Sequence, residues 1–217
     1  MLVKICKITL FLLFIFYQSA SYSKKPDSIN FSKKNVYNYF SALISLENNQ
    51  NVESLKFFNS SKYLKESHRS YIKKYLFSLI LNGKIDRAIH ELKTIQSKKF
   101  IDFFEAQLLL ALDSLKKNDY KNSLFYINNL KRHKNEGTIE YITSSILDEY
   151  IYLFNNNKIK SNFENFGNLS LINRALQSCY LDKTDTESFF NKIIEFDDEG
   201  YSRYMFFYVN YLLSQNN

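Results

Sequence analysis

Apolar residues recur every three or four positions along most of the chain from about residue 35 onwards. This is the spacing of one face of an α-helix, and no stretch alternates with the period of two that a half-buried strand needs. The pattern predicts helices over residues 35–47, 52–64, 68–81, 85–97, 101–117, 120–133, 138–154, 170–181, 185–196 and 201–213. We therefore expect an all-α protein.

The two residues that most strongly interrupt helices are rare and stand between the predicted helices. The four glycines occupy the breaks in the apolar pattern, at Gly83, Gly137, Gly167 and Gly200. The only proline, Pro26, lies among Ser, Asp and Lys residues in the segment 24–34, which is typical of a linker. Short breaks between helices favour antiparallel neighbours.

A tight turn followed by a helix with a small residue on its apolar face occurs three times. The turns lie at Asn49–Asn51, Asn82–Lys84 and Asn118–Tyr120. The small residues that follow them, Ser54, Ala88 and Ser123, are 34 and 35 residues apart. A period of about 34 residues indicates an array of helix–turn–helix units.

The three units resemble the tetratricopeptide repeat (TPR) family over residues 35–135. The family pattern has Trp, Leu–Gly and Tyr in its first helix, then Ala, an aromatic residue and Pro. The corresponding residues are Ser41, Ala42, Ser45, Ser54 and Phe58; Ile72, Tyr75, Leu76, Leu79, Ala88 and Leu92; and Leu110, Ala111, Ser114, Ser123 and Ile127. The sequence departs from the pattern in having no Trp, and in having Glu66, Phe100 and Asn135 where each Pro would stand. The segment also resembles exported repeat proteins of alphaproteobacteria, which implies an envelope location only.

The resemblance implies a TPR-like α-solenoid of antiparallel helix pairs over residues 35–135, with a helical C-terminal extension over 136–217. In such arrays the first helix of each unit lines a concave groove that binds peptides. The implied groove residues are Tyr39, Leu43, Leu46, Lys73, Phe77, Ile80, Leu108, Leu112 and Leu115. Among them only Lys73 suits a C-terminal carboxylate, so the resemblance carries no carboxylate clamp. An apolar groove suits an amphipathic helix or an extended apolar segment of a partner protein; alternatively, the same polypeptide fills it.

The last predicted helix has an aromatic side, formed by Tyr204, Phe207, Tyr208, Tyr211 and Leu212. It is similar to the first helix of a further unit, whereas a solenoid normally ends in a helix with a polar outer face. Three interpretations stay open. The chain is truncated before a further repeat, its end docks onto another surface, or the helix packs back on residues 138–196.

The first 23 residues have the pattern of a secretory signal peptide. Lys4 and Lys7 precede a short apolar run over residues 8–17, and small residues follow it. We expect cleavage near Ser21 or Ser23 and a location in the periplasm or cell envelope. Retention of the segment would instead anchor the protein at a membrane. Cleavage removes Cys6 and leaves Cys179 as the only thiol, so no internal disulfide is expected.

Charge does not indicate a nucleic-acid partner. The chain of 217 residues has a net charge of +7. Its lysines are spread along the sequence, whereas proteins that bind nucleic acids concentrate basic residues on one face. We interpret the excess as charge on solvated helix faces and in the linker, and contact with an anionic surface is the alternative.

No residue pattern predicts catalysis, a cofactor or a metal. The three histidines, His68, His90 and His133, lack metal-ligand spacing. No glycine motif for a phosphate or a nucleophile elbow is present, and Cys179 has no nearby histidine. The acidic turn 197–200 lacks the alternating acidic spacing of an EF-hand loop. The sequence thus predicts a non-catalytic scaffold that binds a protein or peptide. The alternatives are the helical scaffold portion of a larger envelope enzyme, such as a cell-wall lyase, and a membrane-anchored assembly factor.

Overall fold

The computed structural model describes residues 32–131, 135, 137–195 and 202–215. Within these residues every regular element is helical and no strand occurs, so the expected all-α class is confirmed. The predicted signal peptide, most of the predicted linker and the acidic turn 197–200 lie outside the described residues.

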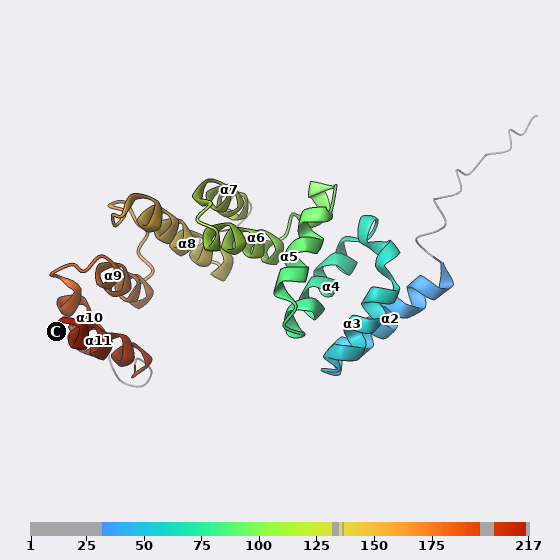
Figure 1. Cartoon of the computed structure of the whole chain (residues 1–217), viewed down its shortest axis with the longest axis horizontal. Helices are drawn as coiled ribbons and strands as arrows, with labels where there is room; N and C mark the ends of the chain where they lie inside the picture. The colour runs from blue at the N-terminus through green and yellow to red at the C-terminus, as the bar shows by residue number, and fades with distance from the viewer. Residues whose placement is uncertain (1–31, 132–134, 136, 196–201, 216–217) are drawn as a thin grey trace, which may run out of the picture.

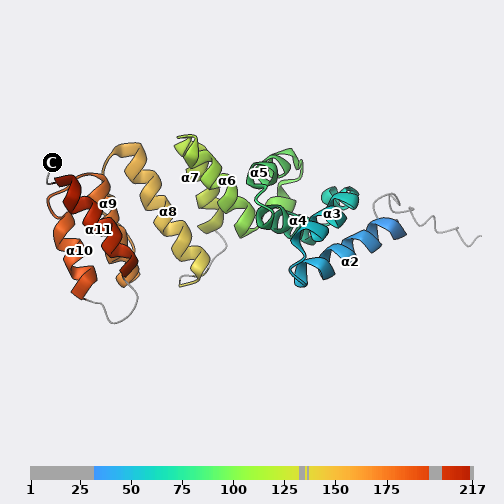
Figure 2. The ribbon, with the colours of Figure 1, turned by 60° about the horizontal axis from the view of Figure 1, so that its bottom comes forward.

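The helices follow one another in an elongated row from α2 at one end to α11 at the other (Figures 1 and 2). They are α2 (Lys33–Glu47), α3 (Asn51–Ser60), α4 (Arg69–Leu81), α5 (Ile85–Thr94), α6 (Phe104–Lys116), α7 (Tyr120–Lys131), α8 (Ile139–Asn156), α9 (Asn168–Tyr180), α10 (Thr186–Glu195) and α11 (Ser202–Gln215). Each predicted helix is therefore present.

The largest errors in the predicted ends come from two 3₁₀ turns, η1 (Lys62–Glu66) and η2 (Lys98–Ile101), which follow α3 and α5. At the end of α3 the hydroxyl of Ser61 donates to the carbonyl of Phe57 at 3.1 Å, a local bond that competes with the continuing helix. The structure thus corrects the predicted ends at residues 64 and 97, and the predicted start of α6 at 101.

The first described helix begins two residues earlier than predicted. The side chain of Ser32 accepts a hydrogen bond from the backbone N–H of Asn35 at 3.3 Å. This N-cap satisfies one of the amides that the first turn leaves without a helical partner. Lys33 and Lys34 therefore belong to α2, and the linker predicted over 24–34 is too long at this end.

Four helix hairpins share one turn geometry. A residue with positive φ follows the first helix of each pair: Asn49, Gly83, Asn118 and Asp182. The next residue donates its N–H to the carbonyl five positions earlier, at 2.8–3.0 Å: Gln50 to Ser45, Lys84 to Leu79, Asp119 to Ser114 and Lys183 to Ser178. These turns satisfy carbonyls at the helix ends and reverse the chain. The repeat pattern predicted the first three; the turn between α9 and α10 is an addition.

Small residues lie where the paired helices cross. Ser54 and Ala88 are fully buried, and Ser123 is 1% exposed. Ser54 Oγ donates to the carbonyl of Ala42 at 3.0 Å, and the corresponding bond in the third hairpin has the same geometry. In the middle hairpin the residue twelve positions before Ala88 is Leu76, which is also buried.

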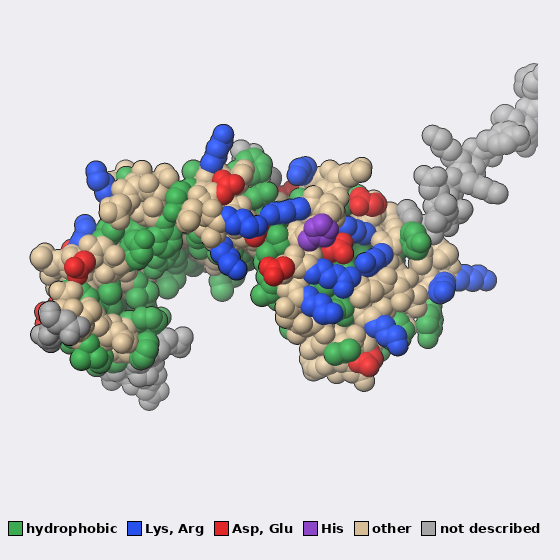
Figure 3. All heavy atoms as spheres, in the orientation of Figure 1, with side chains coloured by type: hydrophobic (Ala, Val, Ile, Leu, Met, Phe, Trp, Pro, Cys, Tyr) green, Lys and Arg blue, Asp and Glu red, His purple; other side chains and the backbone are tan. Residues whose placement is uncertain are grey.

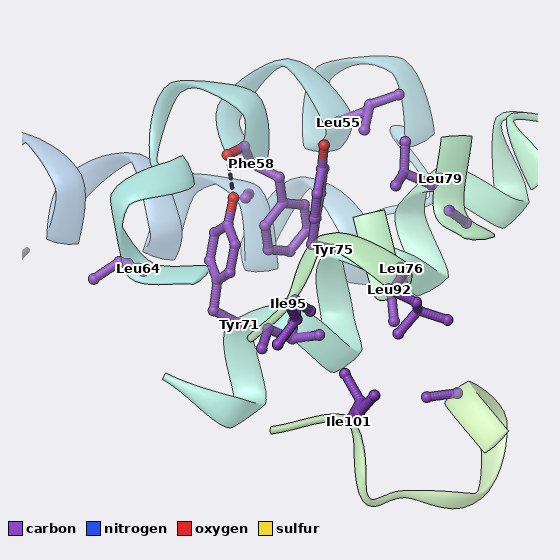
Figure 4. Packing of buried hydrophobic residues seen from close by; sticks show 14 of the residues in the cluster. Leu55, Phe58, Leu64, Tyr71, Tyr75, Leu76, Leu79, Leu92, Ile95 and Ile101 are labelled. Carbon is purple, nitrogen blue, oxygen red and sulfur yellow. Dashed lines mark hydrogen bonds between the residues drawn. The ribbon is translucent and has the colours of Figure 1, made fainter. Parts of the chain in front are cut away.

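The largest core cluster among the described residues extends from α2 to the middle of α6 and is rich in aromatic rings. Tyr71 stacks on Tyr75 with ring centroids 5.6 Å apart, and meets Phe58 edge-on at 5.6 Å. The Tyr71 hydroxyl donates to the carbonyl of Phe58 at 2.6 Å (Figure 4). An aromatic side chain buried in this way contributes both apolar area and a satisfied polar group.

Two further clusters continue the row, and α8 and α9 between them meet through a buried polar contact and through the rings of Phe154 and Tyr180. One joins α6, α7 and α8 around Ile127 and Ile151, and the other joins α9, α10 and α11 around Phe190. Between α8 and α9, buried Glu149 accepts from Asn173 at 2.9 Å and from Gln177 at 3.1 Å. The last three helices therefore have an apolar core of their own.

The last helix packs on the helix before it. The ring of Tyr208 stacks on Phe190 with centroids 5.1 Å apart, and Tyr204, Tyr211 and Leu212 pack against the same cluster. This is the arrangement in which the aromatic side packs back on residues 138–196. Phe207 is an exception, since it is 46% exposed.

Candidate protein-binding groove

Helix α4 has one face in the core and one in solvent. It begins after His68, whose Nδ1 accepts from the backbone N–H of Tyr71 at 3.1 Å. Its buried face consists of Tyr71, Ile72, Tyr75, Leu76, Ser78 and Leu79. Lys73, Phe77 and Ile80 are four and three residues apart and so share the other face. Phe77 is 50% exposed and Ile80 is 38% exposed.

An apolar hollow of about 260 Å³ lies between α4 and α6. It is lined by Lys73, Lys74, Leu76, Phe77, Ile80, Phe103, Glu105 and Leu109. Phe77 and Ile80 supply apolar surface that remains accessible to a partner. The hollow is thus a concave site at the place where two helices from successive hairpins diverge.

An ion pair crosses the edge of this hollow. Lys73 Nζ lies 2.7 Å from Glu105 Oε1 and 5.9 Å from the centroid of the Phe103 ring. Both charged side chains are about half exposed, so water screens their attraction and the pair contributes little to stability, about 1 kcal/mol or less. A partner could therefore separate the two side chains at low cost.

The other six predicted groove residues do not line this hollow. Tyr39 and Leu43 are half-buried against the first core cluster, and Leu46 is buried. Leu108 and Leu115 are half-buried against the cluster of α6, α7 and α8. Leu112 is 42% exposed. The structure brings together Lys73, Phe77 and Ile80, and gives the remaining positions mainly packing roles.

Sequence reasoning missed the α6 side of the hollow, which consists of Phe103, Glu105 and Leu109. Phe103 has an extended backbone and precedes α6, whereas the sequence placed it inside a helix. Leu109 stands 35 residues after Lys74. Residues at this position of the repeat lie on the side of their helix that is turned toward the preceding hairpin. The offset of 35 residues would therefore have identified Leu109 as a groove residue.

A second, more polar hollow of about 340 Å³ adjoins the first. Lys73 and Glu105 line both, and Arg69 and Glu140 add charges of both signs to the second. Arg69 donates to the carbonyl of Asp102, which ties α4 to the segment before α6. The apolar hollow therefore has a charged border on one side, which would fix the orientation of a bound segment.

A polar cluster of Tyr75, Arg87 and Glu91 lies between α4 and α5. The Tyr75 hydroxyl lies 3.2 Å from Glu91 Oε1 and accepts from Arg87 at 3.0 Å. Burial, followed by the charge of Glu91, raises the pKa of Tyr75 to about 12. The phenol thus stays protonated near neutral pH, and its neighbours are bound to one another. Arg87 also donates to Asn59 Oδ1 of α3 at 2.6 Å. The cluster thus joins α3, α4 and α5, and we assign it a structural role.

The remaining candidate groups among the described residues do not form a metal-binding or catalytic arrangement. Within the described residues no three His, Cys, Asp or Glu side chains are placed to hold a metal ion. In the same part of the chain, no helix combines the length and apolar character needed to cross a membrane. Burial, and then the charge of Asp182, raises the pKa of the half-buried Cys179 thiol, which disfavours the reactive thiolate.

Comparisons of the chain with protein-family models, curated proteins and solved structures give no match. The fold defines an all-α protein built as a row of helix hairpins, with an apolar hollow between α4 and α6.

Proposed function

We propose that the protein is a non-catalytic protein–protein interaction scaffold, built over residues 35–135 as a TPR-like α-solenoid. Three successive hairpins support this architecture. Their left-handed turn residues, Asn49, Gly83 and Asn118, are 34 and 35 residues apart. The small crossing residues follow the same register, and stacking of equivalent units is how repeat proteins bury a continuous core.

The hollow between α4 and α6 carries the functional part of the proposal. Its partner would be an apolar or amphipathic segment of another protein, with one apolar side chain placed against Phe77 and Ile80. Accessible apolar surface in a concave site is typical of interaction surfaces. A helix or strand laid across it would meet the Lys73–Glu105 pair at the polar edge.

The location proposed for this activity is the periplasm or cell envelope, on the basis of the signal-peptide pattern in residues 1–23. A retained N-terminal segment would make the protein a membrane-anchored assembly factor. A role as the helical scaffold of a larger envelope enzyme is the second candidate. Determining the N-terminal residue and the mass of the endogenous protein distinguishes these forms.

A random peptide library displayed on phage, selected against the purified protein, tests the groove. We expect enrichment of amphipathic peptides with an apolar anchor, and a loss of affinity of at least tenfold in the Phe77→Asp variant. The matched control is Phe125→Asp on α7, which changes a side chain that is 58% exposed and lies outside the hollow. Helicity measured by circular dichroism should be unchanged in both variants.

The affinity of the Leu112→Asp variant for the selected peptides tests how far the groove extends, because Leu112 is exposed but does not line the hollow. A similar loss would show that the bound segment continues along α6. Equal binding of the selected peptides by the wild type and by Phe77→Asp would refute the groove.

A further inference from the structure

The helix at the first end of the row carries an uncovered apolar stripe. Tyr37, Phe40 and Ile44 are 66%, 57% and 63% exposed. Their spacing of three and four residues places them on one face of α2. Residues 35–46 contain no charged side chain, so nothing in this stretch keeps the face solvated by charge.

The register of the repeats shows what usually covers this face. The positions that correspond to Tyr37 and Ile44 are Tyr71 and Ser78 on α4, both fully buried. Phe40 corresponds to Lys74, which is half-buried. Tyr71 is covered by the preceding hairpin, to which its hydroxyl is bonded through the carbonyl of Phe58. The stripe on α2 is therefore a stacking face that no described element covers.

The helix at the other end also has a face that no described residue covers. Tyr208 and Tyr75 correspond, since each packs against a phenylalanine of the preceding hairpin. In this alignment Met205 and Val209 stand where α4 has Ile72 and Leu76. The two residues on α11 are 39% and 47% exposed, whereas Ile72 and Leu76 are 1% and 4% exposed.

Their neighbours on α11 enlarge this face, because Phe206 is 67% exposed and Leu213 is 62% exposed. Residues 204–215 contain no charged side chain. This stretch and residues 35–46 are the two longest uncharged runs in the described part of the chain.

The two faces are at opposite ends of the row, so they cannot cover each other within one molecule (Figures 1 and 2). Hydrophobic side chains also reach the surface over both ends in the space-filling view of Figure 3. On each helix the exposed residues span two turns, roughly 10–12 Å. The faces thus match in length and in apolar character.

The charges beside the two faces are of opposite sign. Lys33 and Lys34 begin α2. Residues 182–195, which include α10, contain four acidic and two basic side chains, although the whole chain has a net charge of +7. Contact between two α2 ends would place like charges together, whereas contact between unlike ends brings opposite charges close.

From these observations we propose that copies of this chain associate head to tail, with the α11 face of one copy packed on the α2 stripe of the next. The contact is heterologous, so it generates a closed ring or an open filament. It uses surfaces distinct from the hollow between α4 and α6, and therefore goes beyond the proposed function.

Sedimentation velocity over a range of protein concentrations tests the proposal, with protein expressed from its full reading frame and its N-terminal residue determined. We expect the wild-type mass to rise with concentration beyond two copies. Phe40→Asp on α2 and Val209→Asp on α11 should each remain monomeric. An equal mixture of the two variants should form dimers and nothing larger, because each retains one intact face.

Control variants distinguish a loss of assembly from a loss of folding and from a loss of peptide binding in the hollow. Phe125→Asp and Phe77→Asp should assemble as the wild type does, even where the second loses peptide binding. Phe40→Ser and Val209→Ser provide milder variants if an Asp variant loses helicity. A wild type that stays monomeric at every concentration overturns the proposal, as does a dimer that survives in either end variant or the absence of dimers in the mixture.

Discussion

The hydroxyl of Ser123 donates a 2.9 Å hydrogen bond to the carbonyl oxygen of Ala111, which lies twelve residues earlier on the facing helix. Ser54 makes the corresponding 3.0 Å bond to Ala42. Because all four residues are nearly or fully buried, the hydroxyls mark positions where two backbones come close. The middle hairpin has Ala88 at this position, and alanine cannot donate such a bond. The three hairpins therefore share a small side chain, and the hydrogen bond is an additional feature of two of them.

Replacing Ser123 should separate these two contributions. Ser123→Ala removes the bond but keeps the small volume, and we expect a loss of about 1 kcal/mol in the free energy of unfolding. Ser123→Leu also pushes the helices apart, and overpacking of this kind costs about 1–3 kcal/mol more. Urea unfolding followed by circular dichroism measures both. Equal losses in the two variants would show that close crossing is unimportant here.

The turn at Gly83 gives a prediction about backbone conformation alone. Its φ of 68° lies in the left-handed region, and a Cβ atom added there would meet nothing within 4 Å. Gly83→Val should therefore destabilise the protein by about 1–2 kcal/mol through backbone strain, without a clash. Gly83→Asn should cost less, because Asn49 and Asn118 adopt the same conformation in the other hairpins. The urea midpoints of the two variants should differ in that order; the reverse order would contradict this reading of the turn.

The ionisation of Glu91 should make the free energy of unfolding depend on pH in the acid range. Burial alone would raise its pKa, but the hydrogen bond and charge of Lys65, together with Lys62 and Tyr75, outweigh burial and hold the pKa below its usual value of 4.5. A carboxyl whose pKa is depressed in the folded state stabilises that state above the unfolded pKa. This contribution should be complete above about pH 5.5 and lost as the pH falls from about 4.5 through the lower folded value.

The comparison of Glu91→Gln with the wild type measures this effect. The variant should have a lower urea midpoint at pH 7 and a smaller further decrease between pH 5 and pH 3. Glu66→Gln, which changes an exposed carboxyl, is the matched control and should retain the acid dependence of the wild type. A parallel decrease in all three proteins would exclude Glu91 as the source.

How far the sequence predicts this molecule depends on whether a feature is local. Apolar spacing located every helix, and the turn with its small residue located three hairpins. The repeat pattern did not predict the turn at Asp182, because Glu187, five residues later, is not small. The hydrogen bonds of this turn are nevertheless the same as in the other three. Leu46 was assigned to the groove by register, but its burial depends on neighbouring helices that register alone does not place.

The candidate site was predictable on one side only. Lys73, Phe77 and Ile80 share a helical face, and helical spacing is local information. Phe103 and Leu109 line the hollow from the next hairpin, which packing between hairpins places beside α4. Only the offset of 35 residues between Lys74 and Leu109 pointed to this side, and no spacing within α6 does so.

The polar contact between α8 and α9 predicts where the row opens first. Glu149 is 8% exposed and receives hydrogen bonds from Asn173 and Gln177. Helices α9, α10 and α11 have their own apolar cluster, so they can separate from α8 without losing their core. Besides this contact, the rings of Phe154 on α8 and Tyr180 on α9 meet edge-on with centroids 5.1 Å apart. Regions joined by few contacts open as cooperative units below the global stability.

Asn173→Ala should make this opening easier. The variant removes one of two donors to a buried carboxylate, and hydrogen bonds to charged groups are worth about 1.5–3 kcal/mol. We expect amide hydrogen exchange in α9 to accelerate by roughly ten- to a hundredfold, since about 1.4 kcal/mol is a factor of ten. Exchange in α4, which belongs to another core cluster, should be unchanged.

Asn210→Ala on the exposed side of α11 is the control, because its amide donates to the carbonyl of Phe206, at 2.7 Å, within the same helix. Equal acceleration in α4 and α9 would mean that the chain unfolds as one unit, and that the Glu149 contact does not divide it.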